Sequence, residues 1–119
     1  MKTYQDLIVW QKSIELVLNI YRLTEKFPKE ETYGIISQIN RAAVSIPSNI
    51  AEGKMRGGDI EFKRFLSIAF ASGAELETQL FIAKKLPKTE KLDYNKVDSL
   101  MGEIMRMLNK LISQLEPSA

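Results

Sequence analysis

The sequence contains no cysteine and no histidine, and these two absences remove much of the common chemistry of small proteins. Without cysteine there is no disulfide and no thiolate nucleophile. Without histidine the chain lacks the usual metal ligand and the side chain that most often transfers protons near neutral pH. The common zinc sites and the triads with an imidazole base are therefore excluded. We expect no metal, no cofactor and no enzymatic activity, and an enzyme built on carboxylates alone is a remote alternative.

Long apolar runs and a strong charge of one sign are missing as well. No apolar stretch approaches the roughly 20 residues that span a membrane, and the N-terminus lacks the apolar core of a signal peptide. We therefore expect a cytoplasmic protein that makes no contact with a membrane. The formal net charge is only +2, so binding to nucleic acid requires a local cluster of basic side chains.

The chain does contain a helical pattern of apolar residues along most of its 119 positions. These residues recur at steps of three and four over 3–26, 30–52, 59–86 and from the predicted N-cap Asp93 to Leu115, which predicts four helices. We predict one domain over residues 1–119, an all-α, antiparallel up-down-up-down four-helix bundle. Pro47 lies inside the second helix, where proline removes a backbone hydrogen bond. We expect a kink between Ala43 and Pro47, and the alternative is two shorter helices.

The first predicted helix has apolar residues on two sides. One stripe contains Leu7, Trp10, Ile14, Val17 and Tyr21, and the second contains Val9, Leu16, Ile20, Leu23 and Phe27. A bundle helix packed on one side needs only one such stripe. We therefore predict that the second stripe forms the interface of a homo-oligomer, so that charged substitutions at Leu16 and Ile20 separate the subunits. The alternative is a first helix that is buried among the other three.

Small residues predict a close contact between the second and third helices. Ala42 and Ala43 are expected to face residues 69–73, with Gly73 against Ala42. Gly53 is expected to end the second helix as a left-handed cap, and Gly57-Gly58-Asp59 supplies a flexible turn and an N-cap.

Polar residues form a further stripe on the same two helices. We interpret this stripe as a hydrogen-bond network between the helices, because a buried arginine requires a nearby carboxylate. The alternative assigns Arg41 and Asn49 to contacts with a ligand. The network residues are Arg41, Ser45, Asn49, Ser72 and Glu75.

Basic residues gather at both ends of the predicted bundle. Lys54, Arg56, Lys63 and Arg64 flank the turn between the second and third helices and are the candidate nucleic-acid site. A second group is interpreted as solvated loop-end lysines, namely Lys26, Lys29, Lys84, Lys85, Lys88 and Lys91.

Several short motifs in the middle of the chain resemble a known family. The central motifs are Tyr33-Gly34, Gln38, Arg41-Ala42-Ala43, Ser45-Ile46, Asn49-Ile50-Ala51-Glu52-Gly53 and Arg56, followed by Phe65-Leu66, Ile68-Ala69, Ser72 and Glu75-Leu76. With Val9-Trp10-Gln11-Lys12 and Phe27-Pro28, they resemble the four-helix bundle proteins encoded within 23S rRNA intervening sequences. The family usually has two adjacent arginines where this chain has Asn40-Arg41.

This resemblance covers about residues 7–86 and implies a homopentameric ring. It also implies kinship with accessory proteins of diversity-generating retroelements, which bind a reverse transcriptase and nucleic acid. The leading hypothesis is therefore a non-catalytic, oligomeric bundle that binds rRNA, another nucleic acid or a nucleic-acid enzyme through its basic loop ends. The competing hypothesis is a structural or protein-interaction bundle that does not bind nucleic acid.

Overall fold

The apolar pattern produces four long helices, and no strand occurs in the part of the chain that the structure describes. A computed structural model describes residues 3–115. Its long helices are α1 (Ile8–Thr24), α2 (Ser37–Met55), α3 (Asp59–Ala83) and α4 (Asn95–Gln114). Short 3-10 turns form η1 (Tyr4–Asp6) and η2 (Lys29–Glu31), and a π turn forms η3 (Thr32–Ile36). The prediction of an all-α protein with four helices is confirmed.

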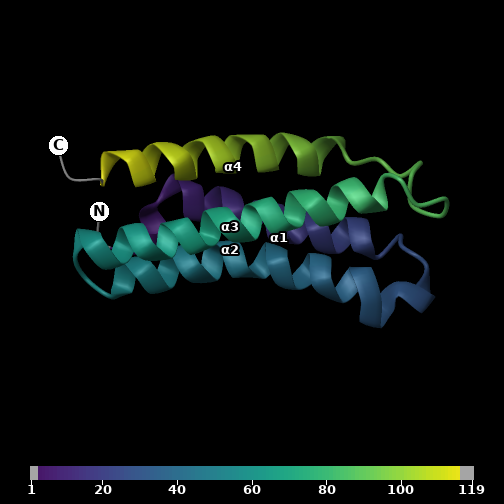
Figure 1. Cartoon of the computed structure of the whole chain (residues 1–119), viewed down its shortest axis with the longest axis horizontal. Coiled ribbons are helices and arrows are strands. Elements are labelled where there is room, and N and C mark those ends of the chain that lie inside the picture. Colours follow the sequence, from purple (N-terminus) through teal and green to yellow (C-terminus); the bar gives the residue numbers. More distant parts are fainter. Residues whose placement is uncertain (1–2, 116–119) are drawn as a thin grey trace.

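The helices lie side by side along the length of the molecule. Figure 1 shows the α2–α3 connection at one end, together with the start of α1 and the end of α4. The α1–α2 and α3–α4 connections lie at the opposite end. Each helix packs against the next one along the chain, and α1 also packs against α4, which is consistent with the predicted bundle. Among residues 3–115, none of the helices is long and apolar enough to cross a membrane.

The beginning of the chain is not one continuous helix from residue 3 to residue 26, as the pattern predicted. Leu7 is extended, with φ −73° and ψ 125°, and separates η1 from α1. The Thr3 hydroxyl accepts a hydrogen bond from the Gln5 amide, and the Asp6 carboxylate accepts one from the Thr3 amide. This capping box stabilises a separate short turn before α1 begins.

Helix α2 passes through Pro47 without a loop, so the alternative of two short helices is wrong. The kink at Pro47 remains a prediction. Irregularity lies instead before α2, where Gly34 in η3 has non-helical angles of φ −107° and ψ −114°. Gly53 is a buried residue inside α2 rather than a left-handed cap, because the helix continues to Met55. The turn that follows uses Gly57 and Gly58, with φ of 73° and 101°, which glycine adopts without steric cost.

The core contains the stripe on α1 that the sequence analysis assigned to an oligomer interface, and that assignment is wrong. Leu16 and Ile20 have an exposed fraction of 0%, and Val9 and Leu23 are buried as well. All four belong to the same cluster as the buried residues of the other three helices. The other stripe on α1 is the one that reaches the surface, because Trp10, Ile14 and Val17 are only partly buried and Tyr21 is exposed. The alternative prediction, a first helix buried among the other three, is correct for Leu16 and Ile20.

The close contact predicted between Gly73 and Ala42 also differs from the structure. A β-carbon added at Gly73 would meet the sulfur of Met105 on α4, not a residue of α2. The glycine at the α2–α3 contact is Gly53, where an added β-carbon would lie 2.5 Å from the β-carbon of Phe65. Glycine therefore allows close packing on two sides of α3, toward α2 at residue 53 and toward α4 at residue 73.

Helix α3 ends three residues before the predicted position, and a buried threonine lies in the loop that follows. The Thr89 hydroxyl donates a hydrogen bond of 2.6 Å to the Ala83 carbonyl, and the Tyr94 hydroxyl donates one of 2.8 Å to the Thr89 carbonyl. Burial raises the pKa of the Tyr94 hydroxyl above its ordinary value. The N-cap of α4 is Tyr94 rather than the predicted Asp93, although the Asp93 carboxylate accepts a hydrogen bond from the amide of Asn95, the first residue of α4.

Candidate nucleic-acid interface

The four basic residues of the candidate site lie where α2 ends and α3 begins. Lys54 and Arg56 lie at the end of α2, and Lys63 and Arg64 lie in the second turn of α3. The two-glycine turn brings these helix ends to one end of the bundle (Figure 1). The arginine side chains are 50% and 60% exposed. The turn thus presents a basic cluster, defined here as Lys54, Arg56, Lys63 and Arg64, at the molecular surface.

Two phenylalanines beneath the basic cluster hold three of its cations. The guanidinium carbons of Arg56 and Arg64 lie 5.1 and 5.0 Å from the ring centre of Phe65, and the Lys54 nitrogen lies 5.2 Å from that of Phe62. Both rings are buried. Cations at this distance from an aromatic face are attracted to its π electrons. The arginines therefore cover apolar surface as well as carrying charge, and the sequence analysis did not identify this role.

Carboxylates that the sequence analysis left out of the site neutralise part of its charge. Arg56 lies 3.2 Å from Glu52 and 3.8 Å from Glu61, and Arg64 lies 3.5 Å from Glu61. Glu61 therefore joins the two arginines across the turn. Residues 52–64 contain four basic and three acidic side chains, a net charge of +1. The electrostatic attraction for a polyanion is accordingly weaker than the four cations alone would give.

The polar network between α2 and α3 contains three of the five predicted residues. The hydroxyls of Ser45 and Ser72 share a hydrogen bond of 2.8 Å that joins the two helices. The Asn49 amide donates to the Ser45 carbonyl at 2.8 Å and to its hydroxyl at 3.0 Å. These bonds satisfy polar groups on the small-residue seam of the hairpin.

Arg41 and Glu75 do not belong to this network. Arg41 is exposed, and among the described residues it forms no hydrogen bond or ion pair with Ser72 or Glu75. Glu75 accepts a hydrogen bond from the buried amide of Gln79 at 3.1 Å. A long arginine side chain can extend into water from a helix seam, which avoids the cost of burying its charge. The need for a carboxylate partner, on which the prediction rested, therefore does not arise.

Lysines at the opposite end are also paired with carboxylates. Lys84 contacts Asp98, and Lys88 contacts Glu30, each at 2.8 Å. The hydrogen bond from Lys88 lowers the pKa of the Glu30 carboxyl, and the same bond raises the pKa of the Lys88 ammonium. The Lys85 ammonium lies 5.3 Å from the ring centre of Phe81. Within residues 3–115 there is no group of His, Cys, Asp or Glu side chains placed to hold a metal ion.

Comparisons with known proteins agree on the fold and the family. A crystal structure described as a protein with unknown function from the S23 ribosomal protein family of Bacteroides thetaiotaomicron VPI-5482 has a TM-score of 0.69 and 24% sequence identity. That match covers 92% of this chain and 100% of the other, and at this identity it shows the fold alone. No curated protein matches. The family model described as 23S rRNA-intervening sequence protein matches residues 5–110, and the chain therefore belongs to this family.

Proposed function

We propose that the protein is a non-catalytic bundle of the cytoplasm that binds RNA through the basic cluster at the α2–α3 turn. The observation that carries the proposal is the position of the Arg56 and Arg64 guanidiniums, both about 5 Å from the Phe65 ring. Stacking limits the motion of the two side chains and reduces the ordering cost of binding. Each guanidinium has several N–H donors, and the ion pairs to Glu52 and Glu61 leave some of them for phosphate oxygens.

Binding through this cluster should depend strongly on salt and weakly on sequence. Phosphate contacts release counterions, so the logarithm of the affinity falls with the logarithm of salt concentration by about 0.7 per contact on single strands. We expect the double variant Arg56→Gln and Arg64→Gln to reduce that slope by about 1 to 2 and to weaken binding to all sequences alike. The measurement is fluorescence anisotropy with labelled rRNA fragments and an unrelated duplex over a range of salt concentrations.

Glutamine is chosen for this test because it retains part of the side chain that covers Phe65. A matched control is Lys85→Gln with Lys91→Gln, which removes two positive charges at the opposite end of the bundle. An equal loss of RNA affinity in both double variants would show that net charge rather than the basic cluster determines affinity. A loss of RNA affinity in the control variant alone would place the binding site at the Lys84–Lys85 end.

A protein partner at the same turn is the second candidate. Met55 and Ile60 lie on either side of the two glycines in the sequence and are 71% and 87% exposed, so both offer apolar surface near the turn. Contact through these two residues would be insensitive to salt, because it buries apolar surface. Two results together would favour this candidate. The parent protein would bind no RNA even at low salt, and the double variant Met55→Ser with Ile60→Ser would lose binding to the protein partner.

We also propose that the protein forms a homo-oligomer, with five subunits expected from the family resemblance. The surface that supports this proposal is a groove between α1 and α2 of about 270 Å³. Its lining is largely apolar, and large apolar patches on a surface often mark an interface. The lining residues are Tyr4, Trp10, Ile14, Val17, Val44, Pro47, Ser48 and Ala51.

The groove gives a test of assembly that leaves the core intact. Val44 is exposed in the single chain, so Val44→Glu should preserve the helical signal while placing a charge in the interface. We expect light scattering to give a multiple of the 13.6 kDa chain mass for the parent and a smaller mass for Val44→Glu. Ile82→Glu on α3, also at an exposed position, is the control and should keep the parent mass. A monomer mass for the parent across micromolar concentrations would contradict the proposal.

A further inference from the structure

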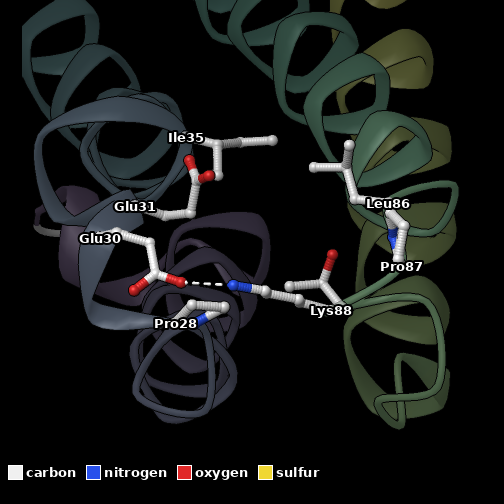
Figure 2. Close-up of a pocket in the computed structure, with 8 residues that line it drawn as sticks. Pro28, Glu30, Glu31, Ile35, Leu86, Pro87 and Lys88 are labelled. Atoms are coloured by element: carbon white, nitrogen blue, oxygen red, sulfur yellow. Dashed lines mark hydrogen bonds and ion pairs between the residues drawn. The ribbon is translucent and has the colours of Figure 1, made fainter.

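A pocket of about 250 Å³ lies between the two loops at the end of the bundle opposite the basic cluster. The α1–α2 connection contributes Pro28 and Ile35 to its walls, and the α3–α4 connection contributes Leu86 and Pro87. Figure 2 shows the Ile35 and Leu86 side chains extending toward one another across the pocket. These walls offer apolar surface to an aliphatic chain, and the family comparisons assign no role to them.

Three charged side chains complete the pocket, and two of them form an ion pair. The Lys88 ammonium donates a hydrogen bond of 2.8 Å to the Glu30 carboxylate across the pocket (Figure 2). Glu31 also lines the pocket and is half-buried. Among the described residues, its carboxylate accepts no hydrogen bond and forms no ion pair within 4.0 Å, although its charge attracts the Lys88 ammonium and helps to raise the Lys88 pKa. The three groups carry a net charge of −1, so the pocket favours a cation.

The backbone around these glutamates is irregular. Glu30 and Glu31 lie in η2, and the π turn η3 with its non-helical Gly34 follows directly. A β-carbon at Gly34 would lie 3.2 Å from a carboxylate oxygen of Glu31, so a larger residue there would require this side chain to shift slightly. Short π segments within helices occur often at functional sites. A carboxylate without a hydrogen bond, an apolar wall and a π turn thus meet at one place.

Lys88 shows which chemistry the pocket accepts. Its aliphatic stem and ammonium already extend into the pocket, with the nitrogen on Glu30. We propose that a second primary alkylammonium group binds in this pocket, with its aliphatic chain against Ile35 and Leu86 and its nitrogen on Glu31. The ligand class comprises a lysine side chain of another protein and a free linear amine, which present the same group. This inference is independent of RNA binding, because the basic cluster lies at the other end of the bundle.

The test is a titration of the full chain with n-butylammonium chloride, followed by NMR of the Ile35 and Leu86 methyl groups at constant chloride concentration. We expect saturable shifts of these methyl signals. The uncharged isostere n-butanol should bind more weakly by up to about fivefold, because an ion pair at a partly exposed site contributes at most about 1 kcal/mol. Equal shifts with n-butanol, or no shifts with either compound, would overturn the proposal.

Two variants at accessible positions locate the cation. Glu31→Gln should weaken butylammonium binding by about fivefold. Lys88→Met should strengthen it, because this change frees Glu30 and makes the pocket charge −2. Unchanged affinity in Glu31→Gln would refute the assigned contact, and weaker binding in Lys88→Met would refute the role of charge. A blocked Gly-Lys-Gly peptide that binds more tightly than butylammonium would identify a lysine of a protein as the ligand, and weaker binding would favour a free amine.

Discussion

Replacing Leu16 with aspartate is expected to unfold most of the bundle. Leu16 is fully buried on α1, and the loss of a buried leucine side chain alone costs roughly 2–5 kcal/mol. The aspartate also places a carboxylate in an apolar core, which adds a desolvation cost or forces the group to bind a proton. The combined loss is comparable to the free energy of unfolding of an ordinary domain, about 5–15 kcal/mol. Far-UV circular dichroism and urea unfolding measure the effect.

Leu18→Asp is the matched control on the same helix. Leu18 is 53% exposed, so its replacement is expected to change the free energy of unfolding by only about 0.5 kcal/mol. If Leu16→Asp kept the helical signal and the unfolding midpoint of the parent but lost subunits, Leu16 would belong to a subunit interface after all. The two substitutions thus separate the core of one chain from contacts between chains.

The apolar pattern of α1 identified two stripes but did not show which one faces the core. Periodicity reports only that residues share a helix face, and both stripes satisfy it. The residue types hold more information than the spacing does. The buried stripe contains Val, Leu, Ile and Phe, none of which has a polar side-chain atom, whereas the surface stripe includes Trp10 and Tyr21, whose polar atoms favour a position at the edge of an apolar region.

The sequence placed the four residues of the basic cluster around the α2–α3 turn, where the structure has them. Their ion pairs with carboxylates were not predicted. Two of these ion pairs could be read from helical spacing, because Glu52 and Arg56 are four residues apart and Glu61 and Arg64 are three apart. The link from Arg56 to Glu61 crosses the turn and depends on how α2 meets α3. The same is true of the Arg56 contact with Phe65, since the ring belongs to the other helix.

The loop-end pocket could not be predicted from spacing at all. Its two walls come from connections that are more than fifty residues apart, as the Glu30–Lys88 ion pair shows. The sequence pattern predicted that the second helix begins at residue 30, because glutamates suit the first turn of a helix. Gly34 instead interrupts the regular geometry, and α2 begins at Ser37. A glycine inside a helical pattern was the available signal for this irregular segment.

Replacing Gly53 with alanine is expected to destabilise the bundle, although the same change in the interior of an exposed helix usually stabilises it by roughly 0.5–1 kcal/mol. The added β-carbon would lie 2.5 Å from the Phe65 β-carbon, an atom fixed directly to the backbone of α3. The clash can be relieved only if α2 and α3 move apart, so we expect a net loss of about 1–3 kcal/mol. Urea unfolding measures this loss.

Two other glycines in helices provide the comparison. At Gly102 an added β-carbon would meet only the end of the flexible Arg106 side chain, at 3.3 Å, so Gly102→Ala should be neutral or stabilising. At Gly73 it would meet the Met105 side chain, which can move, so Gly73→Ala should cost less than Gly53→Ala. A Gly53→Ala protein as stable as Gly102→Ala would mean that α2 and α3 are not in close contact at Phe65. Because Phe65 also supports Arg56 and Arg64, the same result would remove the structural basis of the basic cluster.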